Sequence, residues 1–258
     1  MIAAASVSIL TPVHNGVEFL TECVLSVISQ TFTRWEMWIG VNGHGDDGGD
    51  VGTLVVALSA LDSRIRVVIQ PSTVVGKVAA LNDLFMRSGS GCGAGWIALL
   101  DCDDVWHPEK LEKQMGAVGV GAVVGVGVGV AVVGTQCEYF GAASGSPQIP
   151  TGLISTHDLI HVNPIINSSA LISRAWIERV SEAPNMWSGG GSEWKLTEGT
   201  APLEDYELWM RIVLGGGRLF NLPECLTRHR IHPASAFNSR GHDVRPLREW
   251  FTRKLKGL

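Results

Sequence analysis

Short strand-like runs alternate with helical segments along the N-terminal half of the chain. The strand-like runs are rich in β-branched and apolar residues, and the segments between them repeat apolar residues at helical spacing. Strands are expected at 7–12, 35–41, 65–69 and 96–100, and helices at 19–30, 51–61 and 77–87. Strands that alternate with helices form a mostly parallel sheet covered on both faces. The sequence therefore predicts an α/β fold.

The C-terminal half is less regular. A short buried strand is expected at 130–133, a loop and a strand within 163–173, and helices at 153–161, 204–214 and 248–255. No Pro- or Ser-rich linker interrupts the 258 residues, and a chain of this length can bury one large core. We therefore expect a single domain.

The charge balance excludes two classes of protein. The chain carries 20 basic and 25 acidic residues, a formal net charge of -5, and 45% of its residues are hydrophobic. That hydrophobicity excludes an intrinsically disordered chain. With no basic excess to displace counterions from phosphates, the chain is not expected to bind nucleic acid.

Cysteine usage and the N-terminus indicate a reducing compartment. The five cysteines are odd in number and no two have C-x-x-C spacing, so free thiols are expected rather than disulfides or a zinc knuckle. No Lys or Arg precedes an apolar run at the N-terminus, as a secretory signal would require. The expected location is cytoplasmic.

A low-complexity tract at Gly116–Gly134 has the length of a membrane-spanning helix. Its nineteen residues are nine Val, seven Gly and three Ala. Each glycine weakens a helix by up to ~1 kcal/mol relative to alanine. We therefore expect a loose, irregular segment that ends in the short strand at 130–133, and not a membrane span.

Three carboxylates, Asp101, Asp103 and Asp104, directly follow the apolar run at 96–100. In a parallel sheet, ligands bind beyond the carboxyl ends of the strands, where this loop is expected to lie. The carboxylates would repel one another without a cation, and Mg²⁺ or Mn²⁺ prefers oxygen ligands of this kind. Because Mg²⁺ completes its shell with waters and phosphates, the loop points to a nucleotide diphosphate or triphosphate substrate. The alternative is a solvated acidic loop that caps the following helix.

Two further acids, Glu204 and Asp205, open the amphipathic helix expected at 204–214. An acid at the start of a helix can simply cap it. A carboxylate there can also act as a general base if it lies within hydrogen-bond reach of an acceptor hydroxyl. The spacing of the residues leaves both interpretations open.

Six segments, in collinear order from about Val7 to Phe237, resemble glycosyltransferase family 2, the inverting group with a GT-A fold. The first three correspond to the family's opening strand with its nucleotide-contacting loop, the Ala-x-Asn helix and the metal-binding block. The last three correspond to the strand that lines the sugar pocket, the Glu-Asp helix that carries the base, and the closing motif. The segments are Val7–Gly16, Leu81–Asn82, Trp96–Gln114, Asn163–Arg174, Leu203–Arg211 and Arg228–Ser235.

The resemblance implies a metal-dependent, inverting transfer of a sugar from a nucleotide-diphosphate donor to a hydroxyl of a glycan or lipid-linked acceptor. Asp205, in one motif with Glu204, would deprotonate that hydroxyl, which then attacks the anomeric carbon opposite the leaving nucleotide. Asp103 would ligate a Mn²⁺ or Mg²⁺ ion bound to the diphosphate, and Asp101 would share the metal or contact the ribose. His232 would complete the metal shell or serve as a structural histidine.

The resemblance also implies the residues that bind the nucleotide-sugar. Lys77 would contact a phosphate, unless it is only a solvated helix start. The other positions in matching motifs are Pro12, Val13, Asn15, Asn42, Asn82 and Cys102. A UDP-sugar is the expected donor, with GDP- and dTDP-sugars as alternatives.

The chain departs from the family pattern in two loops. Asn42 stands where the family has an aspartate that contacts the nucleobase, and His14 stands where an aromatic residue is common. An amide can accept a hydrogen bond as a carboxylate does, but it also donates and carries no charge. The choice of nucleobase is therefore open.

The resemblance divides the single GT-A domain, 1–258, into a nucleotide-sugar-binding half (1–115), an acceptor half (135–240) and a basic amphipathic tail (241–258). In the acceptor half, Trp187 and Trp194 flank a Gly-rich segment that would form a mobile acceptor loop, or pack ordinarily. The tail could lie on an anionic membrane surface, but we favour packing of its apolar side on the core. Any membrane contact would be peripheral.

Two rival functions are weighed against glycosyl transfer. A nucleotidyltransferase would need a basic, Gly-rich triphosphate loop near the N-terminus, and residues 11–16 contain no Lys or Arg. A catalytically silent sugar-binding or scaffold protein would not need Asp101, Asp103 and Asp205, although Asn42 and the Gly-Val tract would suit it.

Overall fold

The computed structural model describes residues 6–45, 48–88, 95–121, 130–181, 203–233 and 243–257. Its strands are β1 (Val7–Val13), β2 (Trp35–Val41), β3 (Ile65–Ile69), β4 (Trp96–Leu99), β5 (Val105–Trp106), β6 (Val130–Gly141), β7 (Gly152–Leu153), β8 (Leu171–Ser173) and β9 (Arg218–Ile231). Its α-helices are α1 (Leu20–Ile28), α2 (Gly49–Ser59), α3 (Gly76–Ser88), α4 (Lys110–Gly121), α5 (Thr156–His161), α6 (Arg174–Val180), α7 (Glu204–Leu214) and α9 (Arg245–Leu255). Two short 3-10 helices are η1 (Val17–Phe19) and η2 (Asn167–Ser169).

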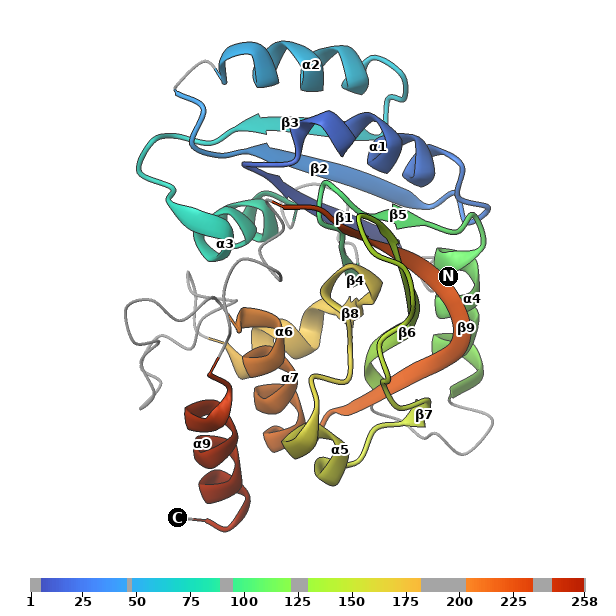
Figure 1. Cartoon of the computed structure of the whole chain (residues 1–258), viewed down its shortest axis with the longest axis vertical. Helices are drawn as coiled ribbons and strands as arrows, with labels where there is room; N and C mark the ends of the chain where they lie inside the picture. Colours follow the sequence, from blue (N-terminus) through green and yellow to red (C-terminus); the bar gives the residue numbers. More distant parts are fainter. Residues whose placement is uncertain are drawn as a thin grey trace.

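The strands of the described residues form one sheet with the order β3-β2-β1-β4-β8-β6-β9-β5, and β7 pairs with β9 (Figure 1). In the N-terminal half, β1 pairs in parallel with both β2 and β4, and β2 pairs in parallel with β3. The carboxyl ends of parallel strands lie at the same edge of a sheet. The loops that follow β1, β2 and β4 therefore meet at one edge.

The C-terminal half completes the sheet with mixed pairing. β8 pairs antiparallel with both β4 and β6, and β5 and β7 pair antiparallel with β9. The two long strands β6 and β9 run parallel to each other and curve together along one side of the molecule (Figure 1). The result is a curled sheet in which the end of β9 returns to the loop after β4.

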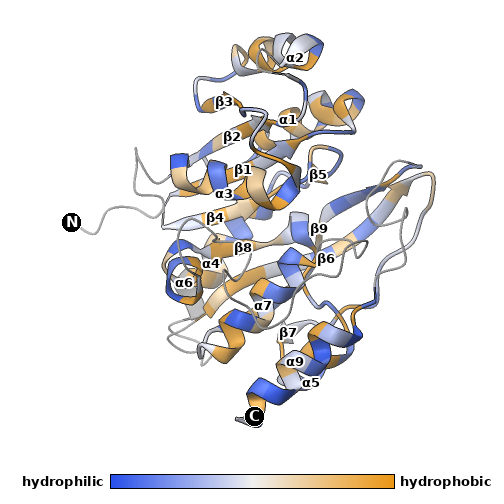
Figure 2. Ribbon diagram, turned by 90° about the vertical axis from the view of Figure 1, so that its left-hand side faces the viewer, coloured by the Kyte–Doolittle hydropathy of each residue, from blue (hydrophilic) through white to orange (hydrophobic). Residues whose placement is uncertain are grey.

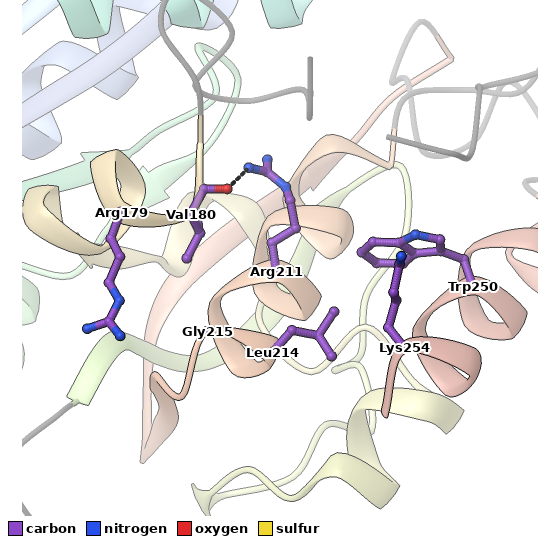
Figure 3. A pocket seen from close by; sticks show the side chains of 7 residues that line it. All are labelled: Arg179, Val180, Arg211, Leu214, Gly215, Trp250 and Lys254. Carbon is purple, nitrogen blue, oxygen red and sulfur yellow. Dashed lines mark hydrogen bonds between the residues drawn. The ribbon is translucent and has the colours of Figure 1, made fainter. Parts of the chain in front are cut away.

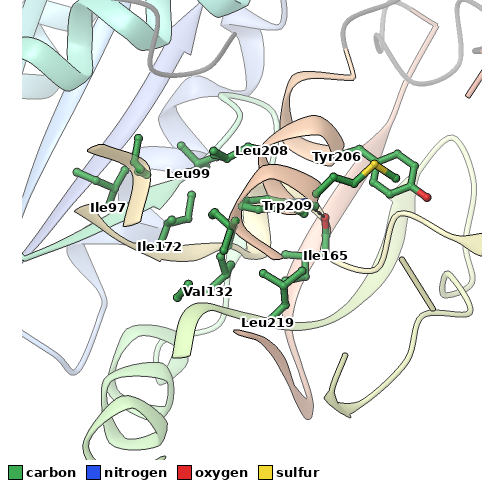
Figure 4. Packing of buried hydrophobic residues seen from close by; sticks show 14 of the residues in the cluster. Ile97, Leu99, Val132, Ile165, Ile172, Tyr206, Leu208, Trp209 and Leu219 are labelled. Atoms are coloured by element: carbon green, nitrogen blue, oxygen red, sulfur yellow. Dashed lines mark hydrogen bonds between the residues drawn. The ribbon is translucent and has the colours of Figure 1, made fainter. Parts of the chain in front are cut away.

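The core lies on both faces of this sheet because side chains of a strand alternate between faces. In β4, Ile97 and Leu99 join the apolar cluster that contains α3, α5, α6, α7 and α9, whereas Ala98 joins the cluster with α1, α2 and α4. Figure 4 shows Leu208 and Trp209 of α7 packed into the first of these clusters. The hydrophobic residues concentrate on the strands, and the outer helices carry mixed colours (Figure 2).

Several sequence predictions are confirmed. The strands at 35–41 and 65–69 and the helix at 204–214 have the predicted bounds. The tail helix packs its apolar residues on the core, since Leu247, Trp250 and Phe251 are buried. The cysteines of the described residues are free thiols: Cys23, Cys102, Cys137 and Cys225.

The helix predicted at 153–161 is wrong in its first turn. Gly152–Leu153 is a strand paired with β9, and the helix begins only at Thr156. Ser155 caps the helix, because its side chain accepts a hydrogen bond from the backbone N–H of Asp158 while the Asp158 carboxylate accepts one from the backbone of Ser155. This reciprocal capping box sets the start of the helix.

The structure also corrects the prediction for the Gly-Val tract. The tract is helical as far as Gly121, as the end of α4, and the short strand expected at 130–133 continues to Gly141 because it pairs with β9. Residues 122–129 lie outside the described residues, as do Trp187 and Trp194. No helix among the described residues is long and apolar enough to cross a membrane.

One charged side chain is fully enclosed in the core. Lys110, at the start of α4, has no solvent exposure, and its Nζ lies 3.9 Å from the centre of the Trp106 ring and donates to Gln114 Oε1 at 2.9 Å. Burial lowers the pKa of this ammonium well below its usual value.

This buried lysine predicts a pH-dependent stability. At a pH where Lys110 is protonated in the unfolded chain but neutral in the folded protein, the unfolded state binds one more proton. The free energy of unfolding therefore rises with pH until the pH passes the pKa of an unfolded lysine, about 10.4. We expect urea unfolding of the wild type at alkaline pH, up to about pH 10, to show a rise of up to ~1.4 kcal/mol per pH unit from this group. Lys110→Met should remove that part of the slope; parallel pH profiles for the two proteins would contradict it.

Candidate active site

The three carboxylates after β4 point to different partners. Asp101 pairs with Lys77 Nζ at 2.9 Å, and both of its oxygens accept from Asn167 Nδ2 at 3.1 Å. Burial would raise the pKa of Asp101, but the Lys77 ammonium and these hydrogen bonds hold that pKa below its usual value. Asp101 is therefore an ionised carboxylate paired with Lys77.

Asp103 points to the end of β9. Its Oδ2 lies 2.9 Å from Nε2 of His232, so these two of the predicted metal residues contact each other. Burial, together with the charges of Asp104 and Asp101, raises the pKa of Asp103. The structure thus brings Asp103 and His232 together, whereas Asp101 turns toward Lys77. Within the described ranges, no group of three His, Cys, Asp or Glu side chains is arranged to hold a metal ion.

Asp104 is buried between the acidic loop and β9 and holds the two together. It is fully buried, accepts from the backbone N–H of Arg230 at 2.8 Å and pairs with His229 Nδ1 at 3.0 Å. Arg230 also donates its Nε to the backbone oxygen of Asp103 at 2.9 Å, and its guanidinium lies over the Phe19 ring at 4.3 Å. These contacts fasten the acidic loop to β9.

Lys77 joins the two acidic motifs. At the N-terminal end of α3, its Nζ lies 2.9 Å from Asp101 and 3.3 Å from Oε1 of Glu204. Burial opposes the charge of Lys77, but Asp101 and Glu204 outweigh that effect and raise its pKa. The loop after β4 and the start of α7, which are about a hundred residues apart in the sequence, therefore meet at one ammonium group.

At the start of α7, Glu204 is buried and Asp205 is half-buried. Glu204 Oε1 faces Lys77, and Oε2 has no hydrogen-bond partner in the described part of the chain. Burial raises the pKa of Glu204 to about 6, although Lys77 acts in the opposite direction. Asp205 accepts from Asn163 Nδ2 at 3.0 Å and from the backbone N–H of Tyr206 at 2.6 Å, and burial raises its pKa as well.

The remaining predicted residues lie on β1 and the loop after it, at the end of β2, in the acidic loop and on α3. Gly16 ends the first loop with φ +76°, a conformation that favours glycine, and it lies beside Asp103 and Cys102. Cys102 Sγ donates to the backbone oxygen of Asn15 at 3.0 Å, which ties this loop to the acidic loop. The other members are half-buried Pro12, buried Val13 and half-buried Asn82 on α3.

Asn42 is nearly enclosed at the end of β2, with 5% of its surface exposed. Its backbone N–H donates to the carbonyl of Val13 at 2.9 Å, and its side-chain Nδ2 donates to the carbonyl of Val74. His14, on the neighbouring loop, contacts the backbone oxygen of Asn42 through Nδ1 at 2.9 Å. The bond to Val74 fixes the orientation of the Asn42 amide, whose Oδ1 is the acceptor atom.

Sequence reasoning assigned no role to several residues that orient this site. They are Asn163 and Asn167, which hold Asp205 and Asp101, Ser168, whose Oγ accepts from the backbone N–H of Asp101 at 3.0 Å, and Arg230. The two asparagines stand in the segment Asn163-Pro-Ile-Ile-Asn167, so a pair of amides in an otherwise apolar run was the available signal.

The sheet order and the clustering of acidic loops at one edge define a GT-A glycosyltransferase fold, which the solved structures support. TarS of S. aureus, in complex with UDP-GlcNAc, matches with a TM-score of 0.69 at 13% identity, over 97% of this chain and 66% of TarS 1-349. The mannosyltransferase PcManGT of Pyrobaculum calidifontis, in complex with GDP-Man and Mn²⁺, matches with a TM-score of 0.59 at 13% identity, over 98% of this chain and 70% of that one. At such identities the likeness shows the fold alone.

The sequence comparisons name the family. The model of glycosyl transferase family 2 matches residues 8–181, and the chain therefore belongs to that family. One relative is the O-antigen biosynthesis glycosyltransferase WbnJ of Escherichia coli, 26% identical over 90% of this chain and 82% of WbnJ. The resemblance inferred from six short segments is thus confirmed, and the chain is a glycosyltransferase by family.

Proposed function

We propose that the protein transfers a sugar from a nucleotide-diphosphate donor to a hydroxyl of a glycan or glycolipid, with inversion at the anomeric carbon and with Asp205 as the general base. The observation that carries the proposal is the double contact of Lys77 with Asp101 and Glu204. It brings the acidic loop at the end of β4 and the acids at the start of α7 into one cluster. A donor diphosphate bound at the acidic loop would then lie next to an acceptor hydroxyl bound at the start of α7.

The acid–base role falls to Asp205 because of how its oxygens are held. Asn163 and the backbone N–H of Tyr206 each take one lone pair, and each oxygen keeps a second lone pair for a proton. The raised pKa of this carboxylate increases its ability to accept a proton from a hydroxyl. Glu204 lies beside Lys77 and would balance its charge.

The residues present fit a divalent cation. Asp103 and His232 offer an oxygen and a nitrogen 2.9 Å apart, a pair that suits Mn²⁺ and also Mg²⁺ when waters and phosphates supply the other ligands. The two side chains converge from β9 and the acidic loop, which Arg230 and Asp104 fasten together. A bound ion would stabilise the negative charge that develops on the diphosphate leaving group. Asp101 would orient Lys77 toward the same phosphates or contact the ribose.

The nucleobase is proposed to be one that donates from a ring N–H. Because the amide nitrogen of Asn42 is bound to the carbonyl of Val74, its side-chain oxygen is the atom that can face a base, and it can only accept. Uracil, thymine and guanine carry a ring N–H donor, whereas the matching ring nitrogen of cytosine is an acceptor. Asn42 would therefore do the work of the family's aspartate for UDP-, dTDP- or GDP-sugars. The neighbours' ligands, UDP-GlcNAc in TarS and GDP-Man in PcManGT, are compatible with this choice.

The test is a calorimetric titration with UDP-, GDP-, dTDP- and CDP-sugars, each in Mn²⁺ and in EDTA. We expect one donor with a ring N–H to bind in Mn²⁺, to bind much more weakly in EDTA, and to outcompete the CDP-sugar. Binding of triphosphates alone would replace the proposal with a nucleotidyltransferase. Absence of binding by every nucleotide would indicate a sugar-binding or scaffold protein instead.

A further inference from the structure

An open groove of about 360 Å³ lies where α6, α7 and α9 meet, away from the acids at the start of α7. Its walls combine apolar and basic side chains. Figure 3 shows Arg179 and Lys254 on opposite sides of Leu214, with Arg211 between them and Trp250 beside Lys254. Three cations from three helices therefore border one apolar hollow.

The helix α9 is held rigidly with its charged side outward. Its apolar residues Leu247, Trp250 and Phe251 are buried against the core, and Arg248 donates to the backbone oxygen of His161 at 2.6 Å. Lys254 and Arg253 are exposed, and Leu255 at the end of the helix exposes 42% of its surface. The outward side thus presents cations together with one exposed apolar residue.

Positive charge concentrates at this end of the chain. Residues 245–257 contain five basic residues and one acidic residue, Glu249, although the whole chain has a net charge of -5. Arg245 is engaged by Asp243 at 2.8 Å. Arg179 adds a cation from α6, with its guanidinium face over the Trp176 ring at 4.8 Å, a stacking that leaves the N–H edges able to donate.

Arg211 has a different task in the groove. Its Nη1 donates to the backbone oxygen of Val180 at 3.0 Å and to Ser181 Oγ at 2.7 Å, and its Nε lies 3.7 Å from Glu207. These contacts hold the end of α6 against α7 and so keep Arg179 at the groove. The exposed cations on this side are Arg179 on α6 and Arg253, Lys254 and Lys256 at the C-terminal end of the chain.

We propose that this basic face, formed by Arg179 and the outward side of α9, binds the phosphate groups of anionic phospholipids and docks the protein on a membrane surface. Clusters of about four to eight Lys and Arg residues on an amphipathic helix are attracted to anionic headgroups. Exposed Leu255 can enter the boundary between headgroups and acyl chains, which adds an apolar contribution. The docking goes beyond glycosyl transfer and does not depend on it.

The experiment is flotation of the full chain with two kinds of vesicle. One is phosphatidylcholine alone, and the other is equal parts of phosphatidylcholine and phosphatidylglycerol. We expect binding to the anionic vesicles only, with a loss of binding as salt is raised. The double variant Arg179→Gln/Lys254→Gln should lower the partition coefficient by about thirtyfold, because each cation near the surface contributes independently.

A matched control carries the same change of charge elsewhere. Arg66 on β3 is exposed, and Lys113 lies on α4, so Arg66→Gln/Lys113→Gln alters neither α6 nor α9 and should bind anionic vesicles like the wild type. An equal loss in both double variants, equal binding to neutral vesicles, or no binding to either vesicle would overturn the proposal. Calorimetric binding of inorganic phosphate without vesicle binding would also overturn it, in favour of a soluble anion. Circular dichroism on both variants verifies that they fold.

Discussion

Replacing Asp205 by asparagine should reduce sugar transfer by about a hundredfold or more, while donor binding stays intact. The substitution keeps the shape of the side chain but removes its negative charge and replaces one carboxylate oxygen by an NH₂ group, so the side chain can no longer take a proton from the acceptor hydroxyl. The hydrogen bonds that the Asp205 carboxylate accepts from Asn163 and from the backbone N–H of Tyr206 hold it in one orientation. The measurement is single-turnover transfer, together with donor affinity by calorimetry.

The pH profile supplies a second readout. Because burial raises the pKa of Asp205, its carboxylate is protonated over a wider acidic range than a solvated aspartate. Only the ionised form can act as a base, so wild-type transfer should fall as the pH drops through that raised pKa. Asp50→Asn in the first turn of α2, an exposed carboxylate that is not among the predicted site residues, should leave both rate and profile unchanged. Normal turnover in the Asp205 variant would move the base to another residue.

Replacing Asp103 by alanine or asparagine should weaken Mn²⁺-dependent donor binding by about a hundredfold or more, since even residues outside the ligand shell cost ten- to a hundredfold in metal affinity. The substitution removes a proposed metal ligand but should leave the conformation of the acidic loop intact. The loop is held through the backbone by Arg230 Nε on the Asp103 oxygen, by Ser168 Oγ on the Asp101 N–H, and by Cys102. Donor titration in Mn²⁺ and in EDTA measures the effect.

The asparagine variant separates loss of the metal from loss of the fold. Asp103→Asn conserves volume, and its urea unfolding should match that of the wild type. Asp104→Asn is the informative comparison, because Asp104 is fully buried on His229 and Arg230 and should lose stability as well as binding. If Asp103→Asn binds the donor equally well with and without Mn²⁺ and as tightly as the wild type in Mn²⁺, the metal assignment is wrong.

The local order of the N-terminal half follows from the sequence. The strands at 35–41 and 65–69 appear with their predicted bounds because alternating or continuous apolar residues and flanking polar turns are short-range signals. The acids at 101–104 and 204–205 were also visible, since a carboxylate after a buried strand or at a helix start is a local pattern. Their identification with a family rested on the order of six segments and is confirmed by the family match.

The sequence by itself determined which residues are acidic, where the strands of the N-terminal half lie and which family the chain belongs to. The tertiary structure decided how these residues are used. The long pairing of β6 with β9, which no local pattern predicted, carries Arg230 and His232 to the acidic loop. The same folding separates three neighbouring aspartates: Asp101 meets Lys77, Asp103 meets His232, and Asp104 is buried. Contacts between segments far apart in the chain set the direction of each side chain, and no local spacing records that direction.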